Sequence, residues 1–209
     1  MRRFKKTRDL RAPISEELLG KICCALFEVC HSEYEILLFY FCFSLAFCGL
    51  FSVEELVYTS EHCAHMPLQI EDIDMQFSTS ISAHRVSISV RFSKTDQKGH
   101  GTRIILPSLQ QRSTCPVSRL QTFLEARRRV QGFLFVHDAK SLLNRFRFNA
   151  VLRKTLLKIN HQIFRYKSHS FRIGGATCLA SRGVSHDKIQ LLGSWKSNAF
   201  LKYIRLDMI

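Results

Sequence analysis

Residues 36–51 are the most apolar stretch of the chain, sixteen residues without a charge, and this stretch most restricts the possible folds. The hydrocarbon core of a bilayer is roughly 30 Å thick and takes about twenty such residues to cross, so the stretch is slightly too short. It also contains Gly49 and runs directly into Glu54 and Glu55. We therefore expect a buried central helix in a globular domain, and no membrane partner.

The remaining hydrophobic patterns predict elements that surround this helix. A first helix should begin at Ser15 and bury Leu18, Ile22, Leu26 and Val29. Residues 86–92 alternate apolar and polar side chains as in a half-buried strand, and residues 102–106 return as its antiparallel partner. Residues 66–77 are a weaker candidate for a further strand. These patterns predict an α+β fold, mostly helical with a small antiparallel sheet.

Two further helices are expected in the second half of the chain. Pro116 suits the first turn of a helix that would bury Val117, Leu120 and Leu124 and leave residues 127–129, all arginine, in solvent. Residues 143–159 predict a strongly basic amphipathic helix. Its cations would contact DNA phosphates: Arg145, Arg147, Arg153, Lys154 and Lys158. The alternative for this helix is a face that is simply solvated.

Charge is distributed unevenly along the 209 residues. The formal net charge is +14, and it divides into +5 over residues 1–11, −10 over residues 12–80 and +19 over residues 81–209. A cationic surface of this kind favours a polyanion, because neutralising phosphates releases counterions. Double-stranded DNA is therefore the expected partner, with a solvated basic surface as the alternative.

Residues 168–205 concentrate side chains that suit a phosphate. Ser168 is a good residue type to cap a helix, and His169 and Arg172, three residues apart, would then share one face of its first turn. A helix N-terminus favours anions, and a guanidinium can grip phosphate oxygens with two hydrogen bonds. Gly183 and Gly193 would end two short helices, and the only tryptophan, Trp195, and then Tyr203 follow.

The order H-x-x-R, L-G-x-W, Y-I-R resembles the catalytic half of the tyrosine recombinases, the phage-integrase superfamily, and most closely versions from eukaryotic mobile elements of the DIRS or Crypton type. In that family a tyrosine attacks a DNA phosphodiester without metal or cofactor, giving a 3′-phosphotyrosyl bond and a 5′-hydroxyl. The resemblance implies Tyr203 as nucleophile, Arg172 as a phosphate clamp, His169 as acid, base or phosphate contact, and Trp195 as a donor to the phosphate. Counting back from the tyrosine points to Ser194 for that last role, but Trp195 has the competent side chain.

Two earlier segments extend the resemblance, and one departs from it. Residues 46–56 resemble the end of the family's central helix, but Ser52 stands where the first catalytic arginine is expected. A hydroxyl cannot replace a charged, forked donor, and losing one such donor typically costs on the order of 10²–10³ in rate. Glu55 matches a supporting acid, and Lys94, in Ser-Lys-Thr-Asp, matches the lysine that protonates the leaving oxygen.

The eight cysteines show no paired metal-binding spacing and mostly lie in apolar runs, so we expect reduced thiols in an intracellular protein. His62, Cys63 and His65 lack a second ligand pair, and we expect no metal. Without a secretory signal, and with a basic start, the chain is expected in the nucleus.

The sequence thus predicts a basic tail over residues 1–12 and one tyrosine-recombinase-like catalytic domain over residues 13–209, without the helical domain that usually precedes it. The first function hypothesis is DNA recombination or integration, with possible self-association on DNA and no small-molecule substrate. The second is a catalytically decayed, DNA-binding relic of a mobile element, because of Ser52. The third is a non-enzymatic domain that binds an acidic protein.

Overall fold

The computed structural model describes residues 11–59, 66–76, 85–91, 101–109, 114–127, 130–137 and 141–208. The α-helices are α1 Glu16–Val29, α2 Glu33–Cys48, α3 Val53–Leu56, α4 Pro116–Ala126, α5 Arg145–Lys158, α6 His169–Ser181 and α7 His186–Leu192. Short 3₁₀ helices are η1 Ile70–Asp72, η2 Ile163–Arg165, η3 Asn198–Tyr203 and η4 Leu206–Met208. The strands are β1 Ile73–Gln76, β2 Arg85–Val90 and β3 Thr102–Pro107. The predicted mostly helical α+β fold is confirmed.

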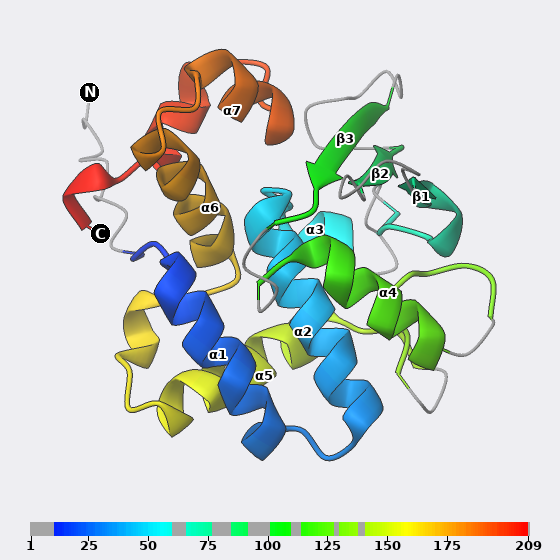
Figure 1. Cartoon of the computed structure of the whole chain (residues 1–209). Coiled ribbons are helices and arrows are strands. Elements are labelled where there is room, and N and C mark those ends of the chain that lie inside the picture. The colour runs from blue at the N-terminus through cyan, green and yellow to red at the C-terminus, as the bar shows by residue number, and fades with distance from the viewer. Residues whose placement is uncertain are drawn as a thin grey trace, which may run out of the picture.

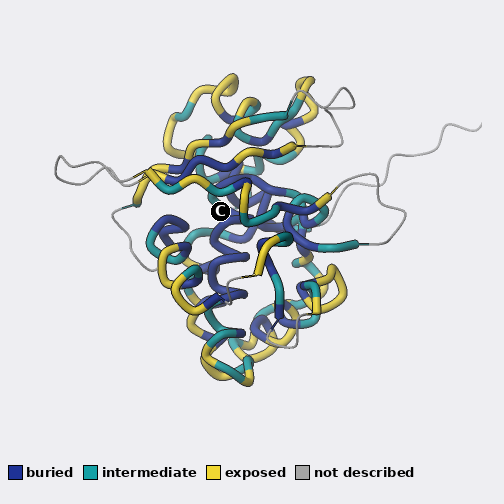
Figure 2. Tube along the Cα trace, turned by 90° about the vertical axis from the view of Figure 1, so that its right-hand side faces the viewer, coloured by how far each residue is buried: buried dark blue, intermediate teal, exposed yellow. Residues whose placement is uncertain are grey.

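Helix α2 is the centre of the molecule, with α1, α4 and α6 packed around it (Figure 1). The Ser32 hydroxyl accepts the N–H of Glu35 and fixes its first turn, and Gly49 ends it. Apolar side chains are buried all round this helix, as expected for a helix covered on every side. Figure 2 shows buried segments running through the middle of the molecule. Within the described part of the chain, no helix has both the length and the apolar character needed to cross a membrane.

The sheet lies to one side of α2, with β2 between β1 and β3 and both pairings antiparallel (Figure 1). In register, Ile88 faces Ile73 on one strand and Ile104 on the other. Val86, Ile88 and Val90 are buried, as the alternation predicts. Ser87 is buried as well, because the Arg103 guanidinium reaches across from β3 and donates to its hydroxyl.

Helix α4 corrects one prediction about exposure. Val117 and Leu120 are buried as predicted, but in the last turn Phe123 is fully buried and Leu124 only half-buried. Arg127, which we expected in solvent, is buried. Its guanidinium donates to the carbonyl oxygens of Leu134, Val130 and Phe133 at 3.0, 2.8 and 2.8 Å. The arginine therefore holds the extended segment after α4 against the core. Arg128 and Arg129 lie outside the described residues.

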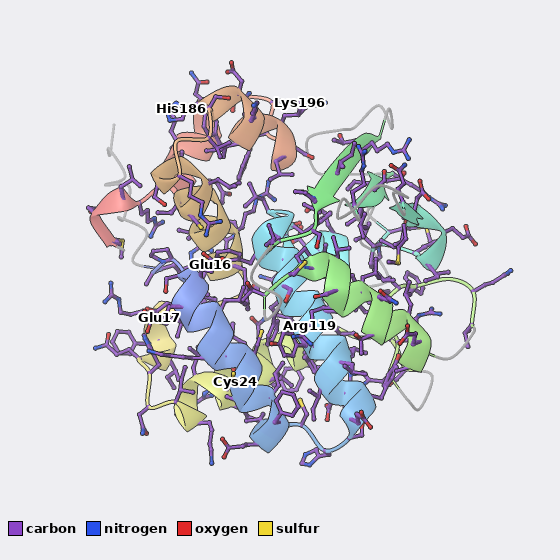
Figure 3. All side chains as sticks on the ribbon, in the orientation of Figure 1. Glu16, Glu17, Cys24, Arg119, His186 and Lys196 are labelled. Atoms are coloured by element: carbon purple, nitrogen blue, oxygen red, sulfur yellow. The ribbon has the colours of Figure 1, made fainter. Side chains whose placement is uncertain are left out.

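Of the described cysteines, Cys24 on α1 is exposed (Figure 3), and the others are buried or half-buried. No described cysteine forms a disulfide. Residues 62–65 lie outside the described residues, so the structure does not test a metal site there. In the parts that are described, no three histidine, cysteine or acidic side chains gather to hold a metal ion.

Candidate active site

Helix α6 is held against the rest of the domain by two adjacent glycines. A Cβ at Gly174 would overlap the carbonyl oxygen of Ile14, and one at Gly175 would overlap that of Phe47. The N–H of Ile14 also donates to the Ser170 carbonyl at 3.1 Å. These close approaches fix the first turn of α6 against residues 11–14 and α2.

The start of α6 differs from the predicted cap. Ser168 occupies the position before the helix, but it has helical φ and ψ angles and its side chain makes no capping hydrogen bond. Instead, the Ser170 hydroxyl accepts the N–H of Lys167 at 3.2 Å, and Asn149 of α5 accepts the N–H of Ser168 at 3.3 Å. This end of the helix is therefore fixed partly by α5. In the first turn of α6, His169 and Arg172, three residues apart, lie on the same side of the helix.

Arg172 is largely buried and ties three elements together. One terminal nitrogen donates to the carbonyl oxygen of Gly193, and the other lies 3.9 Å from a carboxylate oxygen of Glu55. Burial lowers the pKa of Arg172, and the nearby Glu55 opposes that shift. Its Nε is buried and has no hydrogen-bond partner in the described structure.

Tyr203, at the end of η3, lies among the side chains that the sequence singled out. Its ring centroid is 4.8 Å from that of His169 and 4.9 Å from that of Trp195. The Arg172 guanidinium lies 5.7 Å from the Tyr203 ring centroid and 4.3 Å from that of Trp195. Arg172, His169, Trp195 and Tyr203 are thus in mutual contact or close to it.

Local geometry positions Trp195 and Tyr203. Gly193 ends α7, and a Cβ there would overlap the Trp195 ring, so the ring lies directly on this glycine. Ser194 has a left-handed backbone with φ of +53° and turns the chain between them. The Thr177 hydroxyl of α6 accepts the N–H of Arg205 and lies 3.1 Å from the Tyr203 carbonyl oxygen. Tyr203 is the last residue of the 3₁₀ helix η3, and Ile204 follows it.

Ser52 lies at the same site, immediately before α3. Its backbone N–H donates to a carboxylate oxygen of Glu55 at 2.6 Å, and this is the oxygen that lies 3.9 Å from Arg172. Glu55 therefore connects the backbone of position 52 to the Arg172 guanidinium. The Ser52 side chain is half-buried in the same cleft.

These groups line one cleft of about 730 Å³. Its lining contains five cationic residues and two acidic ones, so it carries excess positive charge. The cationic residues are Arg11, Arg145, Arg153, Lys167 and Arg172, and the acidic ones are Glu54 and Glu55. His169, Trp195, Tyr203, Ser52 and Ser194 line it as well. Such a cleft suits a phosphate of a polyanion.

Two of the five cations predicted to face DNA on α5 line the cleft, and three do not. Arg145 and Arg153 line the cleft, and Arg145 lies 3.6 Å from Glu54. Arg147 lies 3.8 Å from Glu35 and Lys158 lies 2.5 Å from Glu28, both outside the cleft lining. Lys154 is exposed and does not line the cleft either. The expected basic face is therefore not one continuous surface toward the cleft.

Lys94 lies outside the described residues. The last described residues before it, Val90 and Arg91, line a small cavity together with Glu55. Sequence reasoning missed Arg11, Phe164 and Lys167 as lining residues of the main cleft. Nothing in their local sequence signals this, because the fold brings their segments to α6 from elsewhere in the chain.

No protein-family model matches the chain, and no curated protein matches it in sequence. Among solved structures, the XerH site-specific recombinase bound to palindromic difH substrate is similar, with a TM-score of 0.65 and 14% identity over 92% of this chain and 49% of that chain. XerA recombinase gives 0.63 and 18% identity over 98% of this chain and 62% of that one. A lambda integrase dimer bound to a core site gives 0.60 and 14% over 97% and 49%.

These neighbours are tyrosine recombinases and integrases, and the chain shares the fold of their catalytic domains. The identities are low, so the likeness concerns the fold. The chain spans about half to three fifths of the length of these structures.

Proposed function

We propose that this chain is a DNA-binding domain that breaks and rejoins a DNA strand through Tyr203. One observation carries the proposal: Arg172, His169, Trp195 and Tyr203 converge on one cationic cleft in a recombinase-like fold. The fold by itself would not support a reaction, since folds host unrelated functions. The arrangement of a phenol, an imidazole and a buried guanidinium supports phosphoryl transfer.

In the proposed step, the Tyr203 hydroxyl oxygen attacks a backbone phosphorus. The P–O5′ bond breaks, leaving a 3′-phosphotyrosyl ester and a 5′-hydroxyl. The phenol proton passes to His169, and the leaving oxygen takes a proton that we assign to Lys94. Arg172 binds the non-bridging oxygens through its guanidinium, and the Trp195 indole N–H adds a neutral donor. No metal or cofactor takes part in this scheme, and reversal of the step rejoins the strand.

A nicked suicide DNA substrate tests the reaction, because loss of a short 5′ fragment traps the covalent adduct. We expect an adduct that survives denaturing electrophoresis and disappears in Tyr203→Phe. Tyr166→Phe is the matched control, since Tyr166 lines the same cleft but has no assigned role. An adduct in Tyr203→Phe, or none from the parent on any DNA tested, would contradict the proposal.

Ser52 supports a second candidate, a DNA-binding relic with little or no cleavage. The relic would bind the same DNA but lack one of the charged donors to the phosphate. We expect Ser52→Arg to raise the adduct rate by on the order of 10²–10³, since one preorganised donor is worth that much. Glu55 already lies next to position 52 and could pair with the new guanidinium. A normal rate in the parent, unchanged by Ser52→Arg, would exclude the relic.

Arg145 is the residue that could supply the charge in place of position 52. It lines the cleft and is held 3.6 Å from Glu54, two residues after Ser52. If Arg145 has this role, Arg145→Ala should lower adduct formation in the parent much more than in the Ser52→Arg variant. Equal losses in both backgrounds would show that Arg145 acts only in DNA binding.

The wider biology belongs to the same proposal. We propose recombination or integration in the nucleus, a mobile-element origin and self-association on DNA; the last is supported by one neighbour, a lambda integrase dimer on its core site. Sedimentation of the chain with and without its DNA would test self-association. A monomer on every DNA that is cleaved would count against it.

A further inference from the structure

Two phenyl rings are exposed beside the cleft, at a place where a domain surface would ordinarily be polar. Phe146 of α5 is 82% exposed and Phe164 of η2 is 74% exposed, the two highest values among the large apolar side chains described. Neither ring serves the core. Single exposed apolar residues are common on protein surfaces, but these two lie on the elements that form the cleft, α5 and η2.

Phe164 lines the cleft itself, between Ile163 and Tyr166, and Lys167 follows. Phe146 is on the turn of α5 that also presents Arg145 and Asn149 to the cleft, and Arg153 lies two turns later on the same side. The hydrogen bond from Ser168 to Asn149 joins α5 to the first turn of α6. The rings thus stand on elements that are fixed relative to Arg172.

The exposed rings and the nearby cations together indicate which kind of molecule can bind here. An apolar protein surface would cover the rings but would bury Arg153 and Lys167 without partners, which is costly. A nucleic acid satisfies both, because its phosphates pair with the cations and a base can stack on a phenyl ring. A base inside an intact duplex has both faces covered by its neighbours. Only an unpaired or unstacked base can lie on Phe164.

We propose that Phe164 binds an unpaired DNA base in the cleft where Arg172 holds the phosphate, with Phe146 exposed on the neighbouring helix α5. The substrate class is therefore DNA with a bulged, mismatched or single-stranded nucleotide at the cleavage position. This inference rests on the proposed function, since it needs DNA in the cleft. It adds a preference that the residues around Tyr203 do not themselves create.

The test compares binding of the full chain to three DNAs of matched sequence: an intact duplex, the same duplex with a one-base bulge, and the single strand. Fluorescence anisotropy with labelled DNA gives the dissociation constants. We expect the bulged and single-stranded DNAs to bind more tightly than the duplex. Phe164→Ala should weaken binding of those two by about 5- to 150-fold, the range for loss of one base–aromatic stack. Duplex affinity should stay within about twofold.

Two variants separate stacking from other effects. Phe164→Tyr keeps an aromatic face and should retain the preference for unpaired bases. Phe27→Ala is the matched control, because Phe27 is 65% exposed on α1, which contributes no residue to the cleft lining. It should leave all three affinities unchanged.

Three results would overturn the inference while leaving DNA binding in place. These are equal affinity for duplex and bulged DNA, an equal loss on all DNAs in Phe164→Ala, and a Phe164→Ala variant that changes only the sedimentation behaviour of the protein. The last would assign the rings to a protein contact. Failure of the parent to bind any DNA would overturn the proposed function together with this inference.

Discussion

Gly193→Ala should disturb the candidate site without replacing any of its functional side chains. The backbone at Gly193 has φ of −84°, which alanine adopts freely, so the substitution introduces no backbone strain. The new Cβ would overlap three atoms of the Trp195 ring. The ring must therefore move away from Gly193, and with it from its contacts with Arg172 and Tyr203.

The cost can be worked from those contacts. Losing the stack of the Arg172 guanidinium on Trp195 costs about 0.5–2 kcal/mol, and losing the Trp195–Tyr203 ring contact costs about 0.5–1.5 kcal/mol. Replacing glycine by alanine returns about 0.4–1 kcal/mol by restricting the unfolded chain. These ranges leave a net loss of about 0–3 kcal/mol in the free energy of unfolding, with a central value of about 1.5 kcal/mol. For a chain of this size the central value lowers Tm by about 3–6 °C.

Gly20→Ala is the matched control, because a Cβ at Gly20 in α1 meets nothing within 4 Å. It should raise stability by about 0.5–1 kcal/mol, so the same substitution has opposite signs at the two positions. Trp195 is the only tryptophan, so its fluorescence reports on the site alone. We expect a shift of its emission to longer wavelength in Gly193→Ala and no shift in Gly20→Ala. Equal stability changes and an unchanged emission spectrum in both variants would refute the stacked arrangement.

Arg153→Ala should weaken binding to all DNA sequences alike and reduce the slope of log K against log salt by about one. Lys158→Ala should change the slope much less, because Lys158 pairs with Glu28 outside the cleft. Equal slopes for the two variants would contradict the assignment of Arg153, but not Lys158, to the cleft. Arg127→Met leaves three carbonyl oxygens without their donor and should cost about 3 kcal/mol in urea unfolding, and a loss below about 1 kcal/mol would argue against its buried role. Burial raises the pKa of the Cys42 thiol well above its ordinary value of 9.0, so its contribution to stability is complete below about pH 9 and declines as the pH rises further, because the unfolded thiol ionises first. The stability difference between the parent and Cys42→Ala should therefore shift in favour of Cys42→Ala above pH 9, and a difference independent of pH would contradict this.

The elements with strong hydrophobic patterns were predictable from the sequence. Residues 36–51 lack charge over four turns and have no alternative to the interior, so α2 follows directly. The alternation over residues 86–90 likewise predicts β2 with one buried face. Burial of Ser87 was not predictable, because it depends on Arg103 in the neighbouring strand.

Arg127 shows where local pattern fails. A run of three arginines at the end of an amphipathic helix indicates solvent, since a buried charge needs several partners. Here the partners are backbone carbonyls of residues 130–134, which turn back over the helix end. Three hydrogen bonds to main-chain oxygens leave no trace in side-chain types, so sequence reasoning has no signal for them.

Part of the candidate site was likewise predictable from the sequence, and part was not. His169, Arg172, Trp195 and Tyr203 lie within 35 residues. The spacing predicted that His169 and Arg172 share one helix face, and the resemblance to the tyrosine recombinases implied that Trp195 and Tyr203 join them. The walls of the cleft come from distant segments: the N–H of Ala12 donates to the Arg165 carbonyl, and the Arg205 guanidinium donates to that of Arg11. These backbone contacts, which join the two ends of the described chain, bring Arg11 to the cleft.

Glu55 explains how a serine at position 52 is compatible with an ordered site. The carboxylate does not need an arginine at that position to be held, because the backbone N–H of Ser52 binds it and Arg172 lies 3.9 Å away. Any residue with an N–H keeps the first contact, so the substitution removes a side-chain donor without unpairing Glu55. A serine at position 52 therefore reduces the positive charge available to a phosphate without disturbing this part of the fold. Glu55 therefore stays paired whichever residue with an N–H stands at position 52, and under the proposed function a change there should alter the rate of strand cleavage.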